Sequence, residues 1–442
     1  MLSRIAVISS LLILVRLTAA TAQPCAELDE FGGIKGVHRA ATGFFRTTKA
    51  DGRWWLVDPN GFVFISTGAN RVRLESSRTT RGSDDYQDVA LRIHGSKRAW
   101  AAAAVQSLQE WRFNTLGADS DRATWGQGMV FIVNLRLTEA VQSRETLSFP
   151  DIFDQNFERG VRRVALRTCK LLADEPWLLG YVTDNPLCWG SDEENLQTLL
   201  GRFLGLGDNT PGRRAILAFL KSRYLNVQEL NLAWGTDYAS FAEIGRTPQV
   251  GSHIPRHDVD GFQKLVAQEY FRIVHDAIRS ADAHHLILGP RFKGIVPIPV
   301  LQAVGEYLDI ISVDHYGASP PAAQLREIHR VTSLPVLISD FGFAVSDTRP
   351  IRREAYPSSS EADVAAKYQQ YFTALIPLPM VVGCHWHSYV DEHEITASGE
   401  PVTKIGLVSR QNVIRKELVE GARELNEIVY ELAAVSREPS RP

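Results

Sequence analysis

Short, almost entirely apolar runs recur along this chain, and they constrain its fold more than any other feature of the sequence. Apolar runs without alternation are typical of parallel strands that are buried on both faces. Helical patterns lie between most of them, at residues 96–111, 156–173, 361–376 and 411–433. Eight runs close on polar or aromatic residues, at Asn70, Asp119, Asn134, Asp184-Asn185, Arg291, Asp314-His315-Tyr316, Asp340 and His385-Trp386-His387.

Eight β–α units predict an α/β fold, the TIM (β/α)8 barrel, in which the carboxyl ends of the strands line one mouth and carry the catalytic side chains. A doubly wound sheet is the alternative, but no glycine-rich phosphate turn follows the first run. That first run closes a predicted hairpin in residues 52–72, whose turn is Asp58-Pro59-Asn60-Gly61.

The fourth and fifth runs are about a hundred residues apart, which is far more than one crossover helix needs. Residues 190–283 are therefore expected to form a helical insertion between strands 4 and 5 that leans over the barrel mouth. Thr210-Pro211 predicts a helix N-cap followed by a first-turn proline, and a later helix is expected from Asp260 to Ser280. The barrel is expected to span residues 23–436, with a frayed tail at 437–442.

The first 22 residues have the pattern of a secretory signal peptide. Arg4 supplies a positive charge, the run from Ile5 to Val15 is apolar, and Ala20-Thr21-Ala22 resembles a cleavage site. We expect a secreted or periplasmic protein cleaved near Ala22. No later stretch approaches the ~18 apolar residues that a membrane span needs.

Composition restricts the partners. The formal net charge of −3 implies neither a nucleic acid nor a membrane surface. The four cysteines, at positions 25, 169, 188 and 384, match no zinc motif and leave room for one disulfide whose pairing the sequence does not give. No cofactor is expected.

The strand ends supply the candidate catalytic and binding residues. Asp340 ends the seventh run and is the best-placed carboxylate, although a buried aspartate tied to backbone amides is the alternative. Asp184 ends the fourth run, where a structural role is favoured over a role in binding. His315, His385, His387 and Asp391 allow a metal site as a further alternative, because two histidines at i and i+2 share one face of a strand.

Four segments, taken together, resemble the clan of retaining glycoside hydrolases on (β/α)8 barrels, in its agarase and β-galactosidase branches. They are residues 51–72, 178–189, 219–241, and 383–391 with 404–408. The resemblance covers about Asp51 to Leu432. It implies a carbohydrate substrate or ligand with β-linked sugars, of galactoside, agarose-like or glucoside type.

The resemblance also implies roles for single residues. Retaining and inverting glycosidases both need two carboxyl groups, one of them an acid. The family's acid/base glutamate is replaced here by Pro186, and its nucleophilic glutamate by Asp340. Asp192, Glu193 and Glu194 are candidate substitute acids, with a solvated helix start as the alternative. The residues expected around the sugar are Asn70, Asp184, Asn185, Arg291, His315, Tyr316, His385 and Trp386.

Two hypotheses follow. One is an exported glycoside hydrolase with a rearranged acid/base. The other is a catalytically inactive carbohydrate-binding protein on the same barrel, with the sugar site kept and the proton transfer lost. Cleavage of natural oligosaccharides distinguishes them, because general acid help is typically worth ~10²–10⁴-fold.

Overall fold

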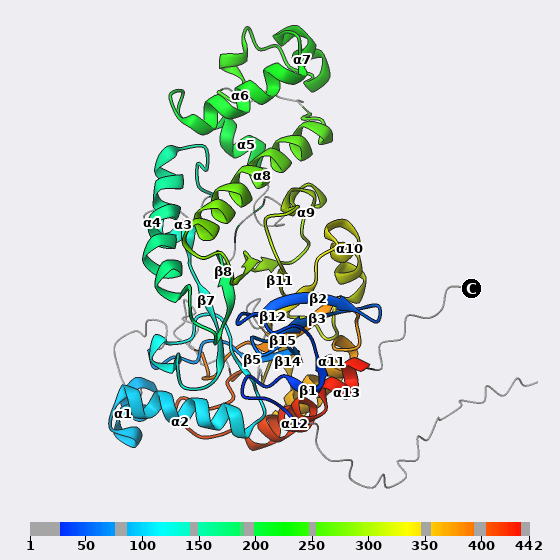
Figure 1. Ribbon diagram of the computed structural model, residues 1–442. Coiled ribbons are helices and arrows are strands. Elements are labelled where there is room, and N and C mark those ends of the chain that lie inside the picture. The colour runs from blue at the N-terminus through cyan, green and yellow to red at the C-terminus, as the bar shows by residue number, and fades with distance from the viewer. Residues whose placement is uncertain are drawn as a thin grey trace, which may run out of the picture.

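The computed structural model describes residues 27–75, 86–141, 149–185, 187, 189, 199–246, 253–345, 355–392 and 404–434. Its centre is a curled sheet of nine parallel strands with helices outside it (Figure 1). This α/β architecture is consistent with a TIM barrel. In sheet order the strands are β10 (Phe292–Lys293), β11 (Ile311–Asp314), β12 (Val336–Phe341), β15 (Val381–Trp386), β5 (Ser66–Ala69), β6 (Thr115–Leu116), β7 (Val130–Asn134), β8 (Leu178–Val182) and β9 (Leu286–Gly289).

The predicted fifth strand is β9, and a second short strand, β10, follows it beyond the predicted end at Arg291. Pro290, which has no backbone N–H, and Gly289, with a φ of 71°, separate β9 from β10. β9 pairs with β8, whereas β10 pairs with β11. The two ends of the sheet order are therefore consecutive in the chain, and β9 also contacts β11.

The predicted hairpin is present, but its second run is also two strands. β3 (Arg53–Val57) pairs antiparallel with β4 (Phe62–Phe64), as expected, and β5 then begins the parallel sheet. β1 (Ile34–His38) and β2 (Arg46–Ala50) complete a small antiparallel sheet in the order β1-β4-β3-β2. Phe45, Leu56 and Phe64 of this small sheet and its loops pack with the apolar residues that fill the inside of the large one, among them Ile132, Leu179 and Leu337.

Helices follow the strands and cover the outside of the sheet (Figure 1). Each helix buries one apolar stripe against the outer face of the strands, and these residues form a single core cluster. This burial accounts for the helical patterns predicted from the sequence. The helices outside the insertion are α1 (Tyr86–His94), α2 (Lys97–Glu110), α3 (Leu137–Val141), α4 (Gln155–Leu172), α9 (Ile298–Val304), α10 (Ala322–Thr332), α11 (Glu361–Leu375), α12 (Lys416–Glu427) and α13 (Val429–Ala434). Short elements η1 (Arg122–Thr124), β13 (Phe343–Val345) and β14 (Tyr356–Ser358) lie in loops.

Four helices and one 3-10 turn lie between β8 and β9, where the insertion is expected. They are α5 (Leu199–Leu204), α6 (Pro211–Arg223), α7 (Val227–Trp234), η2 (Phe241–Glu243) and α8 (Arg256–Ala281). Thr210 caps α6 by accepting a 3.3 Å hydrogen bond from the Arg213 amide, with Pro211 in the first turn. α8 packs on α4 and α9, and Figure 1 shows α6 and α7 beyond the outer end of α8, away from the sheet.

Some sequence expectations fall outside the described residues. The predicted signal peptide, the tail at 437–442, Cys25 and Cys188 are among them. Cys169 and Cys384 are described, and both are free thiols in the core. No helix in the described ranges is both long enough and apolar enough to cross a bilayer.

Candidate active site

A cavity of about 300 Å³ lies where the carboxyl ends of the parallel strands converge. Its lining residues lie at or just beyond the ends of the eight strands from β5 to β12. These residues are Arg71, Arg73, Asp119, Arg136, Glu139, Asn185, Arg291, Lys293, Asp314, Tyr316 and Asp340. The carboxyl ends of parallel strands are where (β/α)8 enzymes carry their catalytic groups, so this cavity is the candidate active site.

Asp340, at the end of β12, is the most heavily coordinated carboxylate of the cavity. Its Oδ1 accepts a 2.8 Å hydrogen bond from Asn70 Nδ2. Its Oδ2 accepts one from the Tyr316 hydroxyl at 2.7 Å, contacts His387 Nδ1 at 2.9 Å, and forms an ion pair with Arg291. Asp340 is 1% exposed, so these partners come from four different strand ends and together enclose it.

The approach of Asn70 to Asp340 depends on a glycine. A Cβ on Gly117 would lie 2.0 Å from Asn70 Oδ1, so only glycine permits this side chain to lie between β5 and β6. Asn70 also donates a 2.7 Å hydrogen bond to the carbonyl of Ser339, which fixes its amide against the strand that carries Asp340.

Arg291 links two carboxylates at the base of the cavity. Its Nε donates to Asp314 Oδ1 at 2.9 Å, while its terminal nitrogen contacts Asp340. Burial alone would raise the pKa of Asp340, but Arg291 and His387 outweigh it and hold that pKa well below its usual range. Burial raises the pKa of Asp314 despite Arg291, and the charge of Asp340 adds to this rise. The two carboxyl groups therefore differ in proton affinity although they share one guanidinium.

His387 joins Asp340 to a second carboxylate. Its Nε2 lies 3.4 Å from Glu392 Oε2, and Glu392 in turn forms an ion pair with Arg71. Burial would lower the pKa of His387, but the two carboxylates outweigh burial and raise it to about 9. His387 is therefore a cation at neutral pH.

Three residues that line the cavity hold strained backbone. Arg71, Asp119 and Arg136 have φ values of 54°, 63° and 48°, the left-handed region that costs a residue with a Cβ roughly 1–2 kcal/mol. Each follows one of three neighbouring strands, β5, β6 and β7. Such strain concentrates at functional sites, because the surrounding structure must hold it in place.

The structure brings Asn70, Asn185, Arg291, Tyr316 and Asp340 of the predicted set to this cavity or to its base. Asp184 points elsewhere, although it precedes Asn185. Its Oδ1 accepts hydrogen bonds of 2.8 Å from both the amide and the hydroxyl of Thr138, and its Oδ2 accepts one of 2.6 Å from Tyr270. Burial raises the pKa of Asp184 to about 6. Its contacts tie α3 and α8 to the end of β8.

The aromatic and histidine candidates are mostly turned away from the cavity. Trp386 is 0% exposed, donates to the Ile405 carbonyl at 2.9 Å and packs edge-on against Phe341. Its ring therefore presents no open face for a sugar. His385 Nε2 contacts Ser66 Oγ at 2.8 Å, and burial lowers the His385 pKa to about 3.

The remaining candidates for a metal site lie apart from one another. His315 contacts the Tyr371 hydroxyl at 3.0 Å, and Asp391 forms a 2.6 Å ion pair with Arg415. Within the part of the chain that the structure describes, no three His, Cys, Asp or Glu side chains are grouped to hold a metal ion.

Pro186, Asp192, Glu193 and Glu194 lie outside the described residues. Several residues that line the cavity are not among the site residues expected from the sequence: Arg71, Arg73, Asp119, Arg136, Glu139, Lys293 and Asp314. Asp119 and Asp314 are themselves strand endings in the sequence, so the position that revealed Asp340 could have revealed them as well. The arginines and Glu139 lie one to five residues farther along, where sequence gives no signal.

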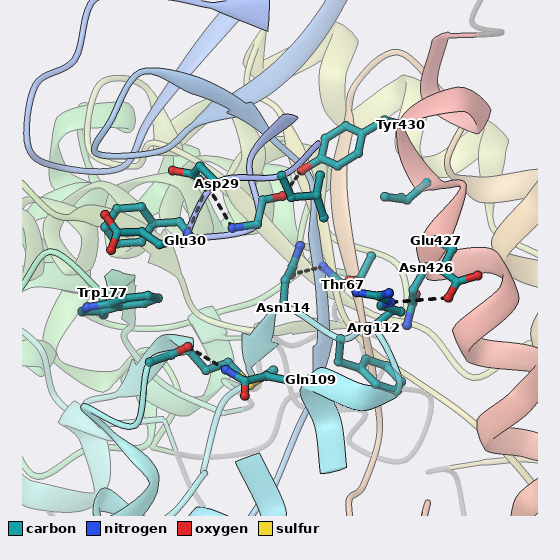
Figure 2. A pocket seen from close by; sticks show the side chains of 17 residues that line it. Asp29, Glu30, Thr67, Gln109, Arg112, Asn114, Trp177, Asn426, Glu427 and Tyr430 are labelled. Carbon is teal, nitrogen blue, oxygen red and sulfur yellow. Dashed lines mark hydrogen bonds and ion pairs between the residues drawn. The ribbon is translucent and has the colours of Figure 1, made fainter. Parts of the chain in front are cut away.

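A larger cavity, of about 420 Å³, lies at the opposite end of the sheet (Figure 2). Its lining includes Asn114, Met129 and Trp177, which immediately precede β6, β7 and β8. Several of its polar groups bond to one another or to backbone, as in the 3.4 Å contact between Arg112 and Glu427. The amino ends of barrel strands serve stability, so this cavity is not the candidate active site.

Comparison with known proteins relates the chain to glycoside hydrolases. The sequence model of Glyco_hydro_42, described as Beta-galactosidase, matches residues 142–362, which is half of the chain. Beta-agarase B of Vibrio sp. (strain JT0107) is 24% identical over 91% of this chain and 50% of its own length. Beta-agarase A of the same strain is 26% identical over 85% of this chain and 45% of its own length. The chain spans about half the length of these curated relatives.

Solved structures show the same fold. An exo-beta-agarase superposes with a TM-score of 0.81 at 23% identity, covering 94% of this chain and 69% of its own. A second agarase structure gives a TM-score of 0.79 at 22% identity, covering 92% and 68%. The protein is thus glycoside hydrolase-like in sequence and fold.

Proposed function

This chain belongs to the Glyco_hydro_42 beta-galactosidase family, and we propose that it is a glycoside hydrolase acting on β-linked galactose-containing oligo- or polysaccharide. The similarity to two beta-agarases supports an agarose-like substrate. The apolar run after Arg4 supports export to the periplasm or the medium, where such polysaccharides are met.

One observation carries the proposal: Asp340 is kept ionised at the carboxyl end of β12, in the cavity where the strand ends converge. Arg291, Tyr316 and His387 stabilise its charged form, so it is available to attack an anomeric carbon or to orient a water molecule. Hydrogen bonds from Asn70 and Tyr316 hold the Asp340 carboxylate in position. Placement matters because attack requires near-contact geometry.

A second candidate, a carbohydrate-binding protein without hydrolysis, is favoured by the same set of contacts. Oδ2 of Asp340 receives three partners and Oδ1 one, so the carboxylate has little capacity left for a substrate atom. Pro186 occupies the position at which the resemblance implies an acid, and its side chain cannot transfer a proton.

The experiment compares the wild-type chain with Asp340→Asn on agarose and β-galactoside oligosaccharides, with product chromatography and calorimetric binding. For a hydrolase, the wild type releases shorter sugars, and Asp340→Asn lowers turnover by roughly 10³-fold or more while binding persists. Asp174→Asn, on the surface, is the matched control. Equal binding by both proteins without any product would instead establish the binding protein.

A further inference from the structure

We propose that this cavity binds saccharides carrying negatively charged substituents, sulfate esters or carboxylates, on both sides of the sugar unit that lies against Asp340. The inference rests on the proposed function only in requiring a saccharide ligand. It holds for a hydrolase and for a binding protein alike, because it concerns the charges around the cavity and not the chemistry on Asp340.

The first positive charge, Arg73, lies beyond β5 and shares its nearest carboxylate with another arginine. Glu392 forms an ion pair with Arg71 and lies 4.0 Å from Arg73, so one carboxylate serves two guanidinium groups. Burial and the charge of Arg71 together lower the pKa of Arg73, as expected for a cation that lacks a counter-ion of its own. The Arg73 side chain is 26% exposed and lines the cavity, so a ligand can reach it.

The second positive charge is Lys293, which lies on β10. The Lys293 amine is 5.9 Å from the centre of the Tyr316 ring, the same ring whose hydroxyl donates to Asp340. Among the described residues, Lys293 has no carboxylate within ion-pair distance. Its amine therefore lines the cavity as a cation held over an aromatic face, which leaves its N–H donors available to an anion.

The two charges flank Asp340 evenly. Sheet order runs β10, β11, β12, β15, β5, so the strand of Asp340 lies two strands from each of the two that lead to Lys293 and Arg73. With neighbouring strands ~4.8 Å apart, the strands that lead to Lys293 and Arg73 each lie about 10 Å from the strand of Asp340. A saccharide that crosses the mouth over Asp340 would meet a positive group on either side.

A third arginine on the rim is already neutralised and does not add to this excess. Arg136 contacts Asp119 at 2.7 Å and Glu139 at 3.4 Å, so it has two carboxylate partners. Deeper in the cavity, Arg291 is shared between Asp314 and Asp340, and its Nη1 has no hydrogen-bond acceptor among the described residues. A ligand oxygen could accept a hydrogen bond from this nitrogen. The positive excess is thus local, at Arg73 and Lys293.

The test measures binding of three oligosaccharides of equal length: neutral agarose-derived, sulfated galactan-derived and galacturonate. The full-length chain carrying Asp340→Asn is used, so that no substrate is cut during titration. At low salt, one or both charged oligosaccharides should bind roughly tenfold tighter than the neutral one, which is the worth of one charge-assisted contact. The advantage should shrink as ionic strength rises to about 0.15 M.

Variants that remove one charge each test whether Lys293 and Arg73 cause the preference for charged oligosaccharides. Lys293→Gln and Arg73→Gln should each remove most of the preference, and each should weaken binding of the charged oligosaccharide by a larger factor than binding of the neutral one. Lys170→Gln, on α4 and far from the cavity, makes the same charge change and should have no effect. The sulfate and carboxylate probes distinguish the two anionic groups.

Neutral and charged oligosaccharides that bind equally well, or a preference that survives both variants, would overturn the inference and leave the proposed function standing. If none of the three oligosaccharides binds, the inference and the proposed function both fail. A preference that both variants abolish supports the inference whether or not the wild type releases product.

Discussion

The hydroxyl of Tyr316 donates a 2.7 Å hydrogen bond to Oδ2 of Asp340, and this bond ties the loop after β11 to the end of β12. Tyr316 lies 5.5 Å from the His387 ring, edge to face, so the phenol and the imidazole approach the same carboxylate oxygen from two sides. Burial and the charge of Asp340 raise the pKa of Tyr316 well above its usual value. Tyr316 therefore stays protonated and serves as a donor at every pH of interest.

Tyr316→Phe should lower turnover of a natural oligosaccharide roughly tenfold to hundredfold, because a hydrogen bond to a charged group is worth about 1.5–3 kcal/mol. The ring and its packing are retained, so the thermal midpoint should change little. Steady-state kinetics beside a melting curve test this. Tyr307→Phe, whose ring lies against His275 outside the cavity, is the control. Unchanged kinetics in Tyr316→Phe would mean that Asp340 does not depend on this donor.

Stability should fall as the pH rises from about 6.5 to about 9. The folded-state pKa of His387 is raised to about 9 by Asp340 and Glu392 against the effect of burial, while the unfolded value is ~6.5. The stabilisation is therefore fully present below the unfolded pKa and is lost as the pH rises through the folded one. It amounts to about 3 kcal/mol. Urea unfolding at several pH values measures it, and His387→Gln should flatten this part of the profile.

Tyr270→Phe should destabilise the fold by about 1–3 kcal/mol without a direct effect on the cavity. The Tyr270 hydroxyl contacts Asp184 Oδ2 at 2.6 Å and Thr183 Oγ1 at 3.0 Å, all of them buried. Removing it leaves a buried carboxylate oxygen without its donor. Denaturant unfolding with the Tyr307→Phe control measures the cost. A loss of saccharide affinity larger than the loss of stability would instead give Asp184 a role in binding.

The strand ends could be predicted because a strand buried on both faces has a continuous apolar sequence. The first polar residue after that run marks the carboxyl end of the strand. Asp340, Tyr316 and Arg291 are brought together for this reason. The break between β9 and β10 could not be predicted with equal ease, although Pro290 is the residue that causes it. β10 has only two residues, which is too short a stretch for the sequence to indicate which strand it pairs with.

Trp386 shows what strand alternation adds. His385 in β15 and His387 directly after it lie at i and i+2, so Trp386 between them faces the opposite way. Its ring packs against Tyr368 of α11, in the layer outside the sheet. Period-two alternation could have separated Trp386 from the cavity, whereas the resemblance to a family places all three residues together.

The arginines at the rim of the cavity could not be predicted from the sequence. Arg71 and Arg136 line it only because their backbone is left-handed, a conformation that residues with a Cβ adopt when tertiary contacts hold them there. No local pattern encodes such a turn in an arginine. Arg71 pairs with Glu392, which is far away in the sequence, and Arg136 pairs with Asp119, which follows the neighbouring strand β6.

Glu139 on α3 is the described carboxylate best placed to donate a proton to a leaving sugar. Glu139 follows β7, but the two hydrogen bonds from Thr138 to Asp184 fix α3 against the end of β8, next to the strand end where the resemblance implies an acid. Its side chain is 46% exposed and pairs with Arg136 at 3.4 Å. An acid that must regain its proton each cycle needs such exposure. Asp314, at the base of the cavity, lacks it.

Glu139→Gln should therefore lower turnover of natural oligosaccharides roughly 10²–10⁴-fold, the usual worth of general acid catalysis. An aryl glycoside with a nitrophenolate leaving group departs without a proton, so its rate should fall far less. Rates on both substrates, for the wild type, Glu139→Gln and the surface variant Glu158→Gln, give the comparison. If Glu139→Gln slows the two substrates equally, or neither of them, the proton comes from another group. Asp192, Glu193 and Glu194, which lie outside the described residues, would then be the next variants to measure.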